Sequence, residues 1–68
     1  MQLPFTINLL PDGTVVHQDG EYLGTWHIDD ETDAFYLFVP DGADEALLMD
    51  TNKPGLSKRI EEWYATRP

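Results

Sequence analysis

The segment from Glu21 to Val39 reads EYLGTWHI (21–28), DDETD (29–33) and AFYLFV (34–39). The two outer runs are rich in aromatic and β-branched residues, which favour strands, whereas the acidic run between them is typical of a turn. The segment therefore predicts a β-hairpin, and the rest of the chain is organised around it.

The residues before this hairpin predict further strands. Apolar and polar side chains alternate from Gln2 to Leu10, which indicates a strand with one buried and one wet face. Pro4 favours an edge position for that strand, because proline cannot donate a hydrogen bond to a neighbour. We expect strands at residues 2–10, 14–18, 21–28 and 34–39, and a short one at 45–49. The turns that join them are expected at Pro11-Asp12-Gly13, Asp19-Gly20, 29–33 and Pro40-Asp41-Gly42.

The C-terminal segment changes to a helical period. One stripe at helical spacing is formed by Leu56, Ile60, Trp63 and Tyr64. This spacing predicts a helix over about residues 55–66. Both Ser57 and Asn52 are candidate N-caps of this helix, and the pattern does not choose between them.

These elements predict an α+β fold in a single domain spanning residues 1–68. We expect an antiparallel β-meander of four to five strands (2–49) with one C-terminal helix packed on one face. The alternative is a small five-stranded barrel plus the helix, because short strands joined by tight turns also close into barrels.

Turn length sets strand register, and register decides which side chains share a face. A two-residue loop at Asp19-Gly20 pairs Val16 with Leu23, and a five-residue loop at 29–33 pairs Trp26 with Tyr36. The face expected to form the core beneath the helix contains Leu3, Phe5, Ile7, Leu9, Val15, Tyr22, Trp26, Ile28, Tyr36 and Phe38. Gly24, among these aromatic residues, is expected to leave room for Trp63 or a neighbouring ring.

The opposite face is expected to be polar along the first strand, with Gln2, Thr6 and Asn8 in water. Elsewhere it is apolar and carries Val16, Leu23, Phe35, Leu37, Val39, Leu47 and Met49. A single helix covers only one face, and a contiguous exposed apolar patch usually marks an interaction site. The pattern therefore predicts that these seven residues contact a protein partner or a second copy of the chain, unless sheet curling covers them.

The charge of the chain is strongly negative, at −9. Residues 1–52 contain eleven acidic residues and no lysine or arginine. Direct binding to nucleic acid or to an anionic membrane is disfavoured, because phosphate groups require basic side chains. The N-terminus lacks the pattern of a signal peptide, and no apolar run approaches the roughly 20 residues that span a bilayer. We expect a cytoplasmic protein.

No pattern indicates catalysis or a cofactor. The chain has no cysteine, so thiol chemistry and cysteine-based zinc sites are excluded. The acidic turn at 29–33 does not match the spacing of a calcium loop. His17 and His27 are predicted on opposite faces, where they cannot share a metal ion or a proton. We expect no enzyme, no metal and no cofactor.

The sequence therefore favours a non-enzymatic protein–protein interaction or self-association module that uses the second face of its sheet. The acidic rim at Glu21 and 29–33 is expected to favour basic surfaces. The alternative is an acidic nucleic-acid mimic that inhibits a basic DNA-binding protein, which requires carboxylates spaced like phosphates on one face.

Overall fold

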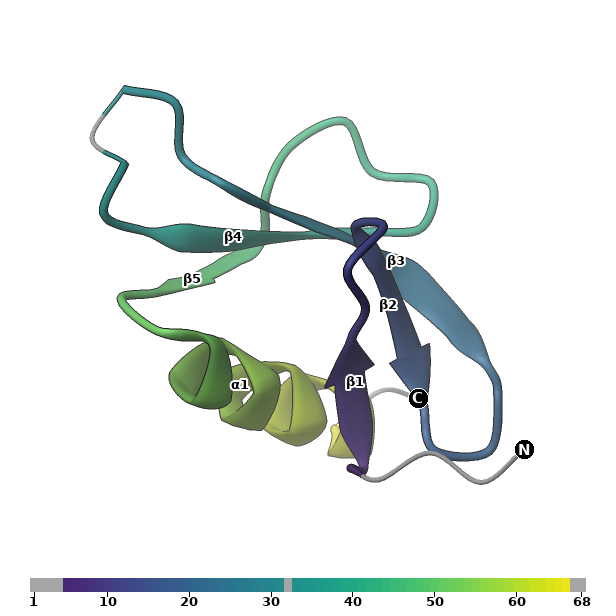
Figure 1. Ribbon diagram of the computed structural model, residues 1–68. Coiled ribbons are helices and arrows are strands. Elements are labelled where there is room, and N and C mark those ends of the chain that lie inside the picture. The colour runs from purple at the N-terminus through teal and green to yellow at the C-terminus, as the bar shows by residue number, and fades with distance from the viewer. Residues whose placement is uncertain (1–4, 32, 67–68) are drawn as a thin grey trace.

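The computed structural model describes residues 5–31 and 33–66. In this part of the chain an antiparallel sheet has the strand order β1-β2-β3-β4-β5 and is followed by one helix. The elements are β1 (Ile7–Leu9), β2 (Thr14–His17), β3 (Tyr22–Ile28), β4 (Tyr36–Pro40), β5 (Leu48–Asp50) and α1 (Lys53–Ala65). The sheet curls into a half-barrel with α1 packed against it (Figure 1), which confirms the predicted α+β meander. Gln2, Leu3 and Pro4, which were predicted to begin the first strand, lie outside the described residues.

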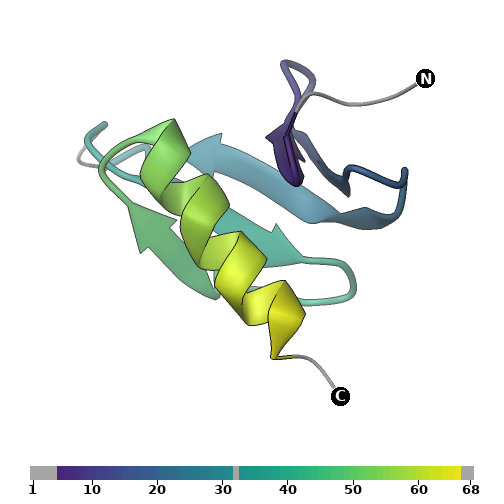
Figure 2. The same cartoon turned by 90° about the horizontal axis from the view of Figure 1, so that it is seen from below.

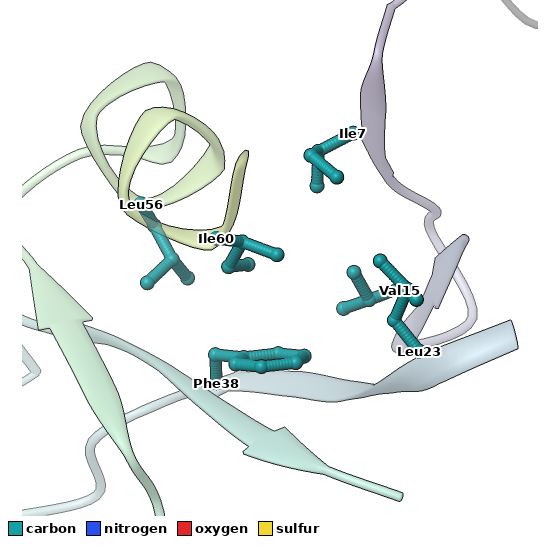
Figure 3. Close-up of a cluster of buried hydrophobic side chains, with 6 residues drawn as sticks. All are labelled: Ile7, Val15, Leu23, Phe38, Leu56 and Ile60. Carbon is teal, nitrogen blue, oxygen red and sulfur yellow. The ribbon is translucent and has the colours of Figure 1, made fainter. Parts of the chain in front are cut away.

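The helix α1 covers the concave face of the sheet and contacts β1, β4 and β5 (Figure 2). Figure 3 shows the buried cluster between them, which consists of Ile7, Val15, Leu23, Phe38, Leu56 and Ile60. Trp63 packs edge-on against Phe38, with 5.3 Å between the ring centroids. The helical stripe predicted from the sequence therefore faces the core.

The hairpin between β2 and β3 differs from the prediction by one residue. The amide of His17 donates to the carbonyl of Glu21 at 2.8 Å, so the loop has three residues rather than two. Val16 consequently pairs with Tyr22, and a β-bulge restores the pairing of Val15 with Gly24. Because side chains alternate between faces, the longer loop exchanges the faces of Tyr22 and Leu23 relative to the prediction, and the bulge returns the residues from Gly24 onward to their predicted faces.

Gly24 accommodates the neighbouring strand rather than an aromatic ring, so the expectation that it makes room for Trp63 is wrong. Its φ angle of 154° lies in a region that residues with a side chain rarely adopt. A Cβ at this position would collide with the carbonyl oxygen of Val39. The amide of Asp41 also donates to the carbonyl of Leu23 at 2.9 Å, so β3 and β4 approach closely here.

The pairing of β3 with β4 is displaced by two residues from the prediction. Trp26 lies opposite Phe38, not Tyr36, and Ile28 lies opposite Tyr36. The amide of Asp29 donates to the carbonyl of Phe35, so these two residues flank the loop and each of its ends lies one residue later than predicted. A shift of two residues leaves every side chain on its predicted face.

The helix begins at the Asn52 cap. The Asn52 side chain accepts a hydrogen bond from the amide of Gly55 at 2.6 Å, and Pro54 occupies the first turn. Ser57 is therefore not the cap. Its hydroxyl instead donates to the carbonyl oxygen of Ile7 at 3.0 Å and ties the helix to β1.

Asn8 is buried, contrary to the wet face predicted for the first strand. It is 3% exposed, and its side chain donates to the carbonyl of Phe5 at 2.6 Å and accepts from the Phe5 amide at 3.2 Å. The amide side chain thus satisfies backbone groups where the chain enters β1.

Within residues 5–31 and 33–66, no helix has the length and apolar character needed to cross a membrane.

Candidate interaction surfaces

The outer face of β4 and β5 carries a group of apolar side chains, which we name the outer patch: Phe35, Leu37, Val39, Leu47 and Met49. Leu37 lies directly opposite Met49 in the β4–β5 ladder. Phe38, between Leu37 and Val39, points into the core, so its two neighbours point away from α1. Leu47 and Met49 are 53% and 50% exposed, and the other three are half-buried.

The outer patch is bordered on one side by polar residues of β3. His27 lies opposite Leu37, and Thr25 lies opposite Val39. Both side chains are exposed. The patch therefore has an apolar centre on β4 and β5 and a polar margin on β3, an arrangement found in many protein interfaces.

Two of the seven residues predicted for an interaction surface lie apart from the outer patch. Leu23 is 2% exposed and belongs to the core, so its predicted place on an interaction surface is wrong. Val16 is half-buried on β2, where it pairs with Asn8 and Tyr22, two strands away from β4. The remaining five residues lie together.

Three residues that were predicted in the core are exposed: Phe5 and Ile28, at 66% and 40%, and Tyr22, which lies on the outer face. Tyr22 is 48% exposed because the three-residue loop pairs it with Val16 and so turns it outward. The sequence held a signal for the longer loop in Gln18-Asp19-Gly20, since three-residue hairpin loops commonly end in a left-handed glycine. Gly20 has a φ angle of 95°.

Acidic loops lie at the two ends of the outer patch. The β3–β4 loop contributes Asp29, Asp30, Glu31 and Asp33, and the β4–β5 loop contributes Asp41, Asp44 and Glu45. Because β4 connects these two loops, they lie at opposite ends of that strand (Figure 1). The outer patch is thus bracketed by negative charge.

His17 belongs to a cluster at the C-terminal end of α1. Its ring stacks on Tyr64 with 4.6 Å between centroids, and its Nδ1 lies 3.1 Å from Asp19 Oδ1. The Tyr64 hydroxyl donates to Glu21 Oε1 at 3.0 Å. The amide of Glu21 donates to Asp19 and lowers the pKa of that carboxyl below its usual value. These contacts fasten the helix to the β2–β3 turn.

His17 and His27 lie on opposite faces of the sheet, as predicted, since His17 contacts the helix and His27 faces outward. No group of three or more histidine, aspartate or glutamate side chains suited to a metal ion occurs among residues 5–31 and 33–66.

Among the described residues outside the His17 cluster, two carboxyl groups have a lowered pKa. Arg59 lowers the pKa of Asp50 by a charged hydrogen bond, and Thr14 lowers that of Asp12 by hydrogen bonds.

No family model, curated protein or solved structure matches the chain. The fold and its surfaces are therefore the basis for the class of protein: a small acidic α+β protein whose curled sheet holds a helix on one face and presents apolar side chains on the other.

Proposed function

We propose that the protein is an interaction module that binds a partner protein through the outer patch. The observation that carries the proposal is the exposure of Leu47 and Met49, each at least half exposed, beside Leu37 and Val39 on the face that α1 leaves uncovered. Grouped apolar side chains on a small domain commonly mark a surface that is buried in a complex.

The charge around the outer patch favours a basic partner. Carboxylates of the β3–β4 and β4–β5 loops flank the two ends of the outer patch. A partner with an apolar centre and lysine or arginine at its edges would complement both features. The flanking charges would accelerate association and select the orientation, while burial of the apolar centre would supply most of the affinity.

The same charges disfavour the binding of a second copy of the chain at the outer patch. Two chains of net charge −9 would bring acidic loops together around one interface. Screening at physiological salt acts over about 8 Å, so repulsion between adjacent loops would persist. Self-association is therefore the less favoured form of the proposal, and a basic partner is the favoured one.

The nucleic-acid mimic receives less support. A mimic needs carboxylates aligned on one face, whereas the acidic loops lie at opposite ends of β4 with apolar side chains between them. The partner would also have to contact acidic side chains primarily, and the apolar strip would have no role.

The test places a photo-crosslinking amino acid at Met49 in the full chain, with a matched probe at the exposed helix residue Glu62. We expect partner capture from the Met49 probe and little from the Glu62 probe. The purified partner should then bind Met49→Asp at least about tenfold more weakly than wild type. The control Gln18→Asp adds the same charge at an exposed turn and should bind normally.

Several outcomes would contradict the proposal. Equal capture from Met49 and Glu62, or equal weakening by Met49→Asp and Gln18→Asp, would remove the outer patch as the contact surface. A concentration-dependent dimer in light scattering that Met49→Asp abolishes would identify a second copy as the occupant. Loss of partner binding only on replacing loop carboxylates would favour the nucleic-acid mimic.

A further inference from the structure

A second surface lies at the other edge of the sheet, between β1 and α1. Here the structure has an open furrow of about 670 Å³, which we name the β1 furrow. Its apolar lining comes from Phe5, Ile7, Leu9, Leu10 and Pro54. Phe5 is 66% exposed, the highest value among the exposed large apolar side chains of the described residues. Figure 2 views the molecule from the side on which β1 and α1 lie next to each other.

The helix runs alongside β1 in the opposite direction. The ammonium nitrogen of its first residue, Lys53, lies 4.4 Å from the centroid of the Trp26 ring, and Trp26 Nε1 donates to the carbonyl of Leu10 at 2.8 Å. Farther along α1, Ser57 bonds the carbonyl of Ile7. The furrow is therefore elongated, and its length on the β1 side is the six residues from Phe5 to Leu10.

The backbone of β1 presents hydrogen-bonding groups to this furrow. The carbonyl of Thr6, just before β1, accepts from Gln18, and the amide of Leu10, just after β1, donates to Thr14, so alternate residues along 6–10 direct their backbone groups to the segment 14–18. In an antiparallel pair the intervening residues direct their amide and carbonyl groups to the opposite side. The Ser57 bond to the Ile7 carbonyl shows this orientation. From the same alternation we infer that the amide and carbonyl of Leu9 also point to the furrow.

The furrow is also the place where the basic residues of an acidic chain gather. Lys53 and Lys58 both line it, and they are two of only four lysine and arginine residues in the chain. Glu61 lines the furrow as well, one turn beyond Ser57. Since Ser57 lies beside Ile7 and Lys53 lies near Leu10, the Leu10 half of the furrow is the more positive.

We propose that the β1 furrow binds an extended peptide segment in which apolar side chains alternate with acidic ones. The backbone of the segment bonds the amide and carbonyl of Leu9, as in the addition of a strand to a sheet edge. Its apolar side chains cover Phe5, Leu9 and Pro54, and its carboxylates meet Lys53 and Lys58. This site prefers the opposite charge to the outer patch, so the two surfaces bind different partners.

The probe is a synthetic peptide, acetyl-Glu-Leu-Glu-Val-Glu-Leu-amide, added to the isotopically labelled full chain and followed by NMR. A matched peptide carries lysine in place of each glutamate. We expect the acidic peptide to shift the amide resonances of Ile7 and Leu9 and to slow hydrogen exchange at Leu9. The lysine peptide should leave these resonances unchanged.

Two variants locate the charge contact. Lys58→Gln removes one exposed positive charge from the furrow and should weaken binding of the acidic peptide about threefold, as expected for an exposed ion pair. Ala46→Glu changes the net charge by the same amount in the β4–β5 loop and should have no comparable effect. The spectra of both variants without peptide report whether the fold is retained.

The proposal is overturned if the acidic peptide causes no shifts, if both peptides bind equally, or if the shifts fall on Leu37 and Met49 instead of β1. It is also overturned if the Ile7 and Leu9 resonances move with protein concentration alone, because the occupant would then be a second copy. None of these readouts depends on partner binding at the outer patch.

Discussion

The hydroxyl of Ser57 donates a hydrogen bond of 3.0 Å to the carbonyl oxygen of Ile7, fifty residues earlier in the chain. This bond joins the middle of α1 to the edge of β1. An exposed sheet edge is a surface on which other chains can pair. Along β1 the helix occupies part of the place where a further strand would lie, and the remaining gap forms the β1 furrow.

Replacing Ser57 with alanine tests this tie. Ser57→Ala leaves the Ile7 carbonyl without its side-chain donor and should lower the free energy of unfolding by about 1 kcal/mol. The neighbouring exposed variant Lys58→Ala should stay within about 0.5 kcal/mol of wild type. Urea denaturation followed by circular dichroism measures both values, and equal stability of the two variants would show that the bond contributes nothing.

The three-residue β2–β3 loop exchanges the faces of Tyr22 and Leu23, and two alanine variants test this exchange. Leu23→Ala creates a cavity in the core and should lower the free energy of unfolding by about 2–5 kcal/mol. Tyr22→Ala removes an exposed side chain and should lower it by about 1 kcal/mol or less. Urea denaturation measures both values. A larger loss of unfolding free energy for Tyr22→Ala than for Leu23→Ala would support the two-residue hairpin loop predicted from the sequence.

Gly24 is required by the close approach of β4. Gly24→Ala combines an unfavourable φ angle with a collision against the Val39 carbonyl, so we expect a loss well above 2 kcal/mol or failure to fold. Gly42 is the matched control, because its φ of 86° is also positive but no atom lies within 4 Å of an added Cβ. Gly42→Ala should lose about 1–2 kcal/mol by thermal or urea unfolding. Similar losses in both variants would contradict the packing argument.

Arg59 Nε lies 2.8 Å from Asp50 Oδ2, and this ion pair predicts that the stability of the fold decreases in acid. Arg59 lowers the pKa of Asp50 in the folded state below its value in the unfolded chain, about 3.9. The pair therefore adds stability above about pH 4, and this contribution is lost as the pH falls through the folded-state pKa.

Asp50→Asn should accordingly be less stable than wild type near pH 7, and the difference should shrink toward pH 2. Unfolding by urea at a series of pH values between 2 and 7 measures this. Asp44→Asn, in the exposed β4–β5 loop, serves as the control variant. A stability difference for Asp50→Asn that does not change with pH would rule out the charged pair as its cause.

Much of the fold follows from local patterns. Alternation of apolar residues and the turn residues predict the order of strands, and the 3.6-residue period of Leu56, Ile60 and Trp63 predicts the helix and its buried side. The outer patch was also predicted in large part, because Leu37 and Val39 alternate with Phe38 on one strand. These features depend on neighbours in the sequence, so no distant contact is needed to find them.

The errors arose where one loop residue or one distant contact decides the outcome. Gln18 belongs to the β2–β3 loop, and this one-residue difference reversed the faces of Tyr22 and Leu23. The alternating pattern predicted that Asn8 is exposed to water, but its side chain is buried because it bonds the Phe5 backbone. The choice between Asn52 and Ser57 as the helix cap, which the sequence left open, was likewise decided by a distant contact, the bond from Ser57 to the Ile7 carbonyl.

The sequence by itself determined the meander, the terminal helix and the excess of acidic side chains, because strand and helix periods and charge are properties of consecutive residues. Tertiary structure alone decided that Leu23 is buried, that Gly24 meets the Val39 carbonyl and that Lys53 and Lys58 line a furrow beside β1. These features join residues far apart in the chain, and their positions depend on how the curled sheet closes around the helix.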